Sequence, residues 1–181
     1  YILVIINIDF MNKTNLSVNL NKVALLRNAR GSDYPSLVKF AKSCMEHDIC
    51  GLTLHPRSDE RHALSSDVID LANLCKENNL EFNIEGNPFN IEKDSFRGYE
   101  NLVTDIKPYQ ATLVPDEDHQ ITSDHGWIRG GHDKELKSII KDIFKELDLE
   151  GKWSYNTSFF RKNKEDMQKG LLDILTGAYT P

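Results

Sequence analysis

The chain has 181 residues, of which 39% are hydrophobic, and a formal net charge of −6. This length and hydrophobic content suffice for one well-buried domain, and the acidic balance excludes the basic footprint of a nucleic-acid-binding protein. The three cysteines show no CxxC spacing, which favours reduced packing residues of a cytoplasmic protein over a disulfide framework or a thiolate metal site.

The amino-terminal run YILVIINIDF is apolar but too short to span a bilayer. It also lacks the basic flank and small-residue cleavage site of a signal peptide, so we expect no membrane partner. The run could form an extra strand. Because Met11 directly precedes a polar linker, we expect instead that residues 1–12 lie outside the domain and that residues 13–181 form it.

From Ser17 onward, short β-like runs alternate with amphipathic stretches, the pattern of repeated βα units around a parallel sheet. We expect strands at residues 17–21, 51–55, 81–85, 110–114, about 153–160, and 171–175. Apolar residues recurring at intervals of three and four predict a helix over 133–149. Further helices are expected over 36–47, after a cap at Ser65 or Ser66, and over 93–106.

A doubly wound sheet and a barrel both fit this alternation. A cluster of polar residues follows each of several expected strands, as on the catalytic face of a barrel, where the βα loops meet. We therefore predict an α/β fold of the TIM-type (β/α)8 class. The chain holds about six of the eight units, so we expect an incomplete, partial barrel.

The first stretch that carries chemistry is VNLNKVALLRNARG, residues 18–31, which we interpret as a strand running into a loop. The planar donors of Arg27 and Arg30 match phosphate oxygens, and Gly31 permits a tight backbone. A phosphorylated substrate is one interpretation. The other is that both arginines pair with acids at the rim of the fold.

The second stretch is GLTLHPRSDERH, residues 51–62, an apolar run that ends in two histidines, two arginines and two acids. Pro56 has no N–H to donate, so the strand stops there and the charged residues follow in a loop. The carboxyl end of a strand is where α/β proteins keep their chemistry. A solvated, salt-bridged turn is the alternative.

The third stretch, FNIEG, places Glu85 at the end of a largely apolar strand. A partly desolvated carboxylate there could accept a proton near neutral pH. Glu85 could instead be a structural partner of Arg57 or Arg61.

Histidines and an acid in the second stretch could also ligate the metal of a phosphoesterase. The candidates are His55, Asp59 and His62, with His125 as a further one. The two histidines lie seven residues apart, without HxH or HxxxH spacing, which argues against a metal site.

In this order and spacing, the three stretches resemble the pyridoxine 5'-phosphate synthase family, which builds the pyridine ring of vitamin B6. YQATLVPDEDHQITSDHGW, residues 109–127, resembles the family's fourth strand and loop, and LLDILTGAYTP resembles its sixth strand. The resemblance covers about residues 16–181. It implies a (β/α)8-barrel transferase that acts in the cytoplasm as a homo-oligomer.

The resemblance also implies a reaction, the condensation of 3-amino-2-oxopropyl phosphate with 1-deoxy-D-xylulose 5-phosphate to pyridoxine 5'-phosphate, phosphate and water. The implied residues for the first substrate are Asn19 and Arg30, and those for the second are Arg57, His62 and Thr122. His55 and Glu85 would be the proton acceptors. Because each step is proton transfer with charge stabilisation, no cofactor or metal is required.

Three departures from the family pattern bear on activity. Asn21 and Lys22 stand where the family often has Asp-His, although Lys22 can still serve a phosphate as a point charge. Asp173 stands where the family has a glutamate that stabilises the transition state, and a carboxylate retracted by roughly an ångström can cost on the order of a hundredfold in rate. Strands seven and eight of the family have no counterpart here. We expect either a fragment of the synthase or a non-catalytic phosphate-binding module or decayed enzyme.

Overall fold

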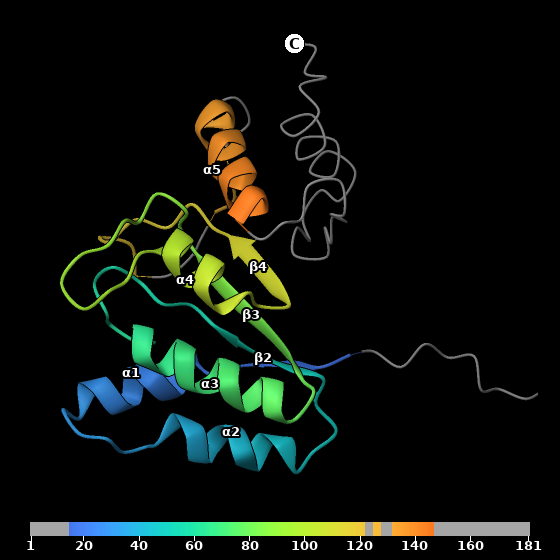
Figure 1. Ribbon diagram of the computed structural model, residues 1–181. Coiled ribbons are helices and arrows are strands. Elements are labelled where there is room, and N and C mark those ends of the chain that lie inside the picture. Colours follow the sequence, from blue (N-terminus) through green and yellow to red (C-terminus); the bar gives the residue numbers. More distant parts are fainter. Residues whose placement is uncertain (1–14, 122–124, 128–131, 147–181) are drawn as a thin grey trace, which may run out of the picture.

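The computed structural model describes residues 15–121, 125–127 and 132–146, in which strands alternate with helices (Figure 1). The strands are β1 Ser17–Asn19, β2 Gly51–Leu54, β3 Glu81–Gly86 and β4 Gln110–Leu113. The helices are α1 Asn21–Ala29, α2 Leu37–Met45, α3 Ser65–Glu77, α4 Tyr99–Ile106 and α5 Asp133–Glu146. The architecture is thus α/β, as predicted.

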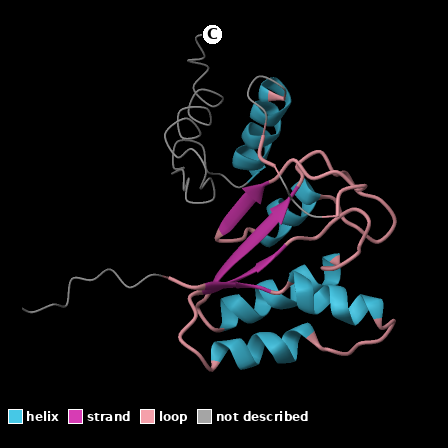
Figure 2. Ribbon diagram, turned by 180° about the vertical axis from the view of Figure 1, so that it is seen from behind, coloured by secondary structure: helices cyan, strands magenta, loops and turns pink. Residues whose placement is uncertain are grey.

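The four strands form one parallel sheet in the order β1-β2-β3-β4. Helix α3 packs against β2 and β3 and contacts both α2 and α4. Figure 1 views the sheet from the side of α3 and α4, and Figure 2 views it from behind. Sequential strand order with a helix in each connection is the arrangement of repeated βα units. None of the described helices is both long and apolar enough to cross a bilayer.

The two faces of the sheet differ in character because successive side chains of a strand point to opposite sides. On the face toward the helices, Leu52 pairs in register with Phe82, and Leu54 with Ile84. These four side chains are buried in the core together with apolar residues of α3 and α4. Burial of this apolar face holds the helices on the sheet.

The opposite face carries a polar ladder that joins all four strands. The hydroxyls of Ser17 and Thr53 lie 3.0 Å apart, and the Asn83 amide donates to Thr53 Oγ1 at 3.5 Å. The Thr112 hydroxyl donates to Asn83 Oδ1 at 2.9 Å. Thr53, Asn83 and Thr112 are buried, so these bonds satisfy polar groups that water does not reach. These hydrogen bonds join each strand to its neighbour and so help to fix the relative positions of the strand ends.

The first strand is shorter than predicted, and the predicted loop after it is wrong. The strand ends at Asn19, and the next segment is helix α1. Asn19 Oδ1 accepts the backbone N–H of Asn21 at 2.9 Å and so satisfies a donor of the first turn. Leu20 and Ala24, four residues apart, are fully buried. This apolar face explains why the segment is helical rather than an open anion-binding loop.

Other boundaries shift by smaller amounts. Ser36 caps α2 as the pattern allows, accepting the N–H of Lys39. Neither predicted serine caps α3, because the Asp67 carboxylate accepts the N–H of Leu64 at 2.8 Å and takes that role. The helix predicted over 93–106 is wrong in its first half, since α4 begins only at Tyr99. The strands expected at 153–160 and 171–175, the end of the helix expected over 133–149, and residues 1–12 lie outside the described residues.

Gly86 is required where β3 meets α4, because a Cβ there would overlap the fully buried ring of Tyr99. We expect Gly86→Ala to lower the free energy of unfolding by about 1–3 kcal/mol through overpacking. Urea denaturation would measure it. In a Tyr99→Leu background, which removes the ring edge, the same substitution should cost less; an equal cost in both backgrounds would refute the overlap.

Candidate active site

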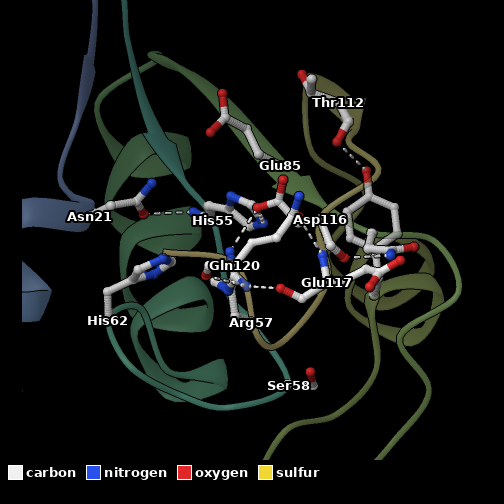
Figure 3. Close-up of polar contacts among 12 residues, drawn as sticks. Asn21, His55, Arg57, Ser58, His62, Glu85, Thr112, Asp116, Glu117 and Gln120 are labelled. Atoms are coloured by element: carbon white, nitrogen blue, oxygen red, sulfur yellow. Dashed lines mark hydrogen bonds and ion pairs between the residues drawn. The ribbon is translucent and has the colours of Figure 1, made fainter. Parts of the chain in front are cut away.

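The carboxyl ends of the parallel strands bring polar side chains from four segments to one edge of the sheet. Figure 3 shows His55 after β2, Glu85 at the end of β3 and Asp116 after β4 around a common centre, with Asn21 of α1 beside them. Asn19, at the end of β1, donates from Nδ2 to Glu85 Oε2 at 3.4 Å. The structure therefore gathers most of the predicted site residues that it describes.

Asn21 holds the backbone of the β2 end in place. Its Oδ1 accepts the main-chain N–H of His55 at 2.7 Å (Figure 3). This bond crosses from α1 to β2 and fixes where the His55 side chain leaves the sheet. Asn21, predicted to bind substrate, thus lies in the site and also anchors the residue beside it.

His55 is buried, with 6% of its surface exposed. Its Nε2 lies 3.6 Å from Asp116 Oδ2, and its ring meets that of His62 edge-on at 5.6 Å between centroids. Burial lowers the pKa of His55 well below its ordinary value, and nearby Arg57 lowers it further, against the opposing effect of Asp116. His55 is therefore a neutral imidazole at pH 7 and carries a lone pair that can accept a proton.

His62 stands beside His55 in the same loop. Its Nδ1 accepts the backbone N–H of Ala63 at 2.9 Å. Burial lowers the pKa of His62 to about 4, and His55 and Arg57 add to that effect. Because Nδ1 is an acceptor, the neutral ring carries its proton on Nε2 and can donate from there.

Arg57 clamps the loop after β2 to the loop after β4. Arg57 is 3% exposed, and its guanidinium bonds Asp116 Oδ2 through Nη1 at 2.8 Å. Its Nη2 donates to the carbonyls of Glu117 and Gln120, and its Nε lies 3.7 Å from Asp59. The predicted phosphate-binding arginine is therefore in the site, with both Nη1 and Nη2 bonded to the protein itself.

The salt-bridged turn considered for residues 51–62 describes part of this loop. Arg61 pairs with Asp59 and donates to the carbonyl of Gln120 at 2.6 Å. His55 and Arg57, by contrast, are buried and not part of a solvated turn. The loop combines an ion-paired outer part with a desolvated inner part.

Glu85 is a carboxylate whose surroundings disfavour its charge. Burial first, and then the negative charge of Asp116, raise the pKa of Glu85 to about 7. Among the described residues it makes no ion pair with Arg57 or Arg61, so the structural-partner interpretation has no support there. A carboxylate poised near neutral pH suits the predicted proton acceptor.

Two residues of the site were not predicted individually. Asp116 is 3% exposed and pairs with Arg57, while Asn87 donates from Nδ2 to the Asp116 carbonyl at 2.6 Å. Asn87 follows β3 directly, as His55 follows β2, and Asp116 lies three residues after the end of β4. That position relative to the strand is the signal by which they could have been found.

The arginine-rich end of α1 divides into two roles. Arg27 bonds both oxygens of Asp67 on α3, at 2.5 and 2.8 Å, which confirms acid pairing for this residue. Arg30 and Lys22 are exposed, and among the described residues no side-chain bond joins them to the His55–Glu85 cluster. Thr122 and Asp173 lie outside the described residues.

The metal alternative gains no support from this geometry. Within the part of the chain that the structure describes, no three His, Cys, Asp or Glu side chains come together as a metal-binding group. The rings of His55 and His62 instead make a T-shaped contact, and His62 Nδ1 accepts the backbone N–H of Ala63.

Comparison with known proteins identifies the family. Residues 16–155 match the model of the family described as "Pyridoxal phosphate biosynthesis protein PdxJ". The chain is 44% identical over 131 residues to the pyridoxine 5'-phosphate synthase of Xylella fastidiosa strain M12, covering 72% of this chain and 50% of that protein. It is 48% identical over 134 residues to the synthase of Xanthomonas axonopodis pv. citri, covering 74% and 52%. The chain thus spans about half the length of these relatives. The family match covers well over half of the chain and confirms the resemblance drawn from the motifs, so the chain belongs to the PdxJ family of pyridoxal phosphate biosynthesis proteins.

Proposed function

We propose that this protein is a pyridoxine 5'-phosphate synthase built on a (β/α)8 barrel, to which the described sheet contributes the first four strands. The substrates would be 3-amino-2-oxopropyl phosphate and 1-deoxy-D-xylulose 5-phosphate, as the resemblance implies. The observation that carries the proposal is that two possible proton acceptors, His55 and Glu85, lie at the same edge of the sheet. Glu85 has a pKa of about 7, and His55 is buried and neutral.

The chemistry needs groups of this kind. The amine of one substrate condenses with the ketone of the other, and protons then leave carbon atoms next to the imine or carbonyl groups. A neutral imidazole and a carboxylate of near-neutral pKa can each take such a proton and return it to a leaving hydroxyl or phosphate. Ring closure then releases phosphate and water.

Substrate binding would use the polar groups around these acceptors. In this proposal Asn19 and Arg30 hold the amino ketone phosphate, and the remaining groups hold the ketose phosphate or the transition state: Asn21, Lys22, Arg57, His62, Thr122 and Asp173. Asp116 and two carbonyls already accept from Arg57, so a phosphate binding there would use its other N–H groups or replace one of these partners. Charge-assisted bonds to phosphate can offset the loss of such a partner.

The proposal is tested by supplying both substrates to the purified protein and measuring pyridoxine 5'-phosphate and released phosphate. Formation of both products in equal amounts is expected. Calorimetry with each substrate alone separates the alternatives. Binding without product would point to a phosphate-binding module, and neither binding nor product would overturn the proposed function.

The pH dependence of kcat/KM should report the ionisation of Glu85. A general base works only when deprotonated, so the rate should rise with pH through about 7 and be about tenfold lower one pH unit below that value. Protonation of His55 should reduce kcat/KM only at much lower pH, because burial lowers the pKa of this residue. Steady-state rates across the range would check this, and a flat profile through neutral pH would contradict it.

A further inference from the structure

Asp116 lies between the two basic side chains of the site. Its Oδ2 is 2.8 Å from Arg57 Nη1 and 3.6 Å from His55 Nε2 (Figure 3). The side chains of all three residues are less than a tenth exposed. Asp116 comes from the loop after β4, whereas His55 and Arg57 come from the loop after β2. The carboxylate therefore reaches across to the imidazole from a separate element.

The loop backbone holds this carboxylate in place. Asn87 donates to the carbonyl of Asp116, and Arg57 donates to the carbonyls of Glu117 and Gln120 just beyond it. The backbone N–H of Val114 also donates to the carbonyl of Gly86 at 2.9 Å, so the main chain is held before and after Asp116. The Asp116 side chain cannot turn away from His55 without breaking the bond to Arg57. This is the arrangement expected of a preorganised partner rather than of a surface acid.

The chemistry of the pair decides which nitrogen of His55 carries the proton. Asp116 pairs with the Arg57 guanidinium, and a carboxylate in such a pair accepts hydrogen bonds. It favours an N–H on the nitrogen that faces it, which is Nε2. A neutral imidazole has only one N–H, so its lone pair must then lie on Nδ1.

The other charged groups around His55 do not reverse this preference. Arg57 and Arg61 disfavour a second proton on the ring, Asp59 favours it, and the ring of His62 lies at 5.6 Å between centroids, inclined by 61°. None of these groups supplies a donor to Nε2 among the bonds of the described residues.

We propose that Asp116 is a positioning residue that holds His55 in the Nε2–H tautomer and thereby leaves Nδ1 as the atom that accepts the proton. The tautomer follows from the geometry alone. Its use in turnover rests on the proposed function. A carboxylate on one imidazole nitrogen fixes the ring and its tautomer in many sites, and loss of that carboxylate puts the proton on the wrong nitrogen.

The test reads the tautomer directly by nuclear magnetic resonance of the chain labelled with ¹⁵N-histidine, near neutral pH and without substrate. Wild-type His55 should show a proton on Nε2 and none on Nδ1. Asp116→Leu removes the oxygen that faces both Arg57 and His55 Nε2, so the preference for Nε2–H should be lost and the form protonated on Nδ1 should appear. Asp116→Glu keeps a carboxylate and should restore the wild-type pattern. The matched control is Asp118→Asn, which removes an exposed carboxylate of the same loop and should change nothing at His55.

A wild-type His55 protonated on Nδ1 would overturn the proposal even if no variant folds. An unchanged tautomer in folded Asp116→Leu would overturn it as well. In the synthase assay, Asp116→Leu should lower kcat on the order of a hundredfold or more, and Asp116→Glu should recover part of the loss. If the spectra behave as expected and the wild type makes no product, the proposed function fails while the positioning role stands.

Discussion

Replacing Glu85 with glutamine is expected to lower kcat by about 10²–10⁴-fold, the usual contribution of a general base. Glutamine matches the carboxylate in shape and can still accept from Asn19, so substrate binding and KM should change little. The acid limb of the pH profile near 7 should disappear with the carboxylate. Steady-state kinetics of product formation across the pH range would measure all three effects.

Glu81→Gln is the matched control, because Glu81 lies on the same strand at the end away from the site. It should leave kcat within about twofold of the wild type, as surface substitutions usually have little effect. A loss in Glu81→Gln as large as in Glu85→Gln would mean that the strand, not the carboxylate at its end, is sensitive. Full activity in Glu85→Gln would remove Glu85 from the mechanism.

The Glu85→Gln substitution should also stabilise the folded protein at alkaline pH. The folded-state pKa of Glu85, about 7, lies above its ordinary value of 4.5, so the folded protein retains a proton that the unfolded chain releases. The stability linked to that proton is fully present below pH 4.5 and is lost as the pH rises through 7. Above 7, Glu85→Gln should therefore exceed the wild type by on the order of 2–3 kcal/mol in free energy of unfolding. Urea denaturation at acid and alkaline pH would show whether the difference grows with pH.

Breaking the buried pair between Arg57 and Asp116 should produce the largest loss of stability. Both side chains are about 3–4% exposed and their atoms lie 2.8 Å apart. Arg57→Met would leave the Asp116 charge buried without its guanidinium, which typically costs about 3–5 kcal/mol. It would also free the carbonyls of Glu117 and Gln120 that now accept from Arg57. Thermal or urea unfolding would give the magnitude.

A double-mutant cycle separates the pair from the packing around it. Arg57→Met with Asp116→Leu removes both charges, so the double variant should lose less than the two single variants together. Arg97→Met is the control for an exposed pair, since Arg97 and Asp105 are about half exposed, and it should cost no more than about 1 kcal/mol. Strict additivity in the cycle would show that the two charges do not act on each other.

Much of the fold could be predicted from local patterns. The strand β2 was expected within one residue of its observed end, because an apolar run before Pro56 leaves few alternatives. The strands β3 and β4 were expected as closely. The segment after β1 was assigned wrongly, because its arginines suggested an anion-binding loop. In the structure Arg27 instead pairs with Asp67, which is forty residues away in the chain.

The sequence by itself was sufficient to predict which polar groups gather at the carboxyl edge of the sheet. Glu85 stands at the end of β3, and the loop after β2 carries His55, Arg57 and His62. Parallel strands that run side by side end at the same edge of a sheet. Motif order and spacing were also sufficient to indicate the family, because such patterns are local properties of the chain.

Only the tertiary structure decided how those groups are tuned. Asp116 lies about sixty residues from the pair it joins, yet it contacts Arg57 and His55 and raises the pKa of Glu85. Burial is likewise a property of the packed molecule, since a residue's desolvation depends on neighbours from other elements. Proton affinity follows from burial and from charges a few ångströms away, and neither can be read from a residue's place in the chain.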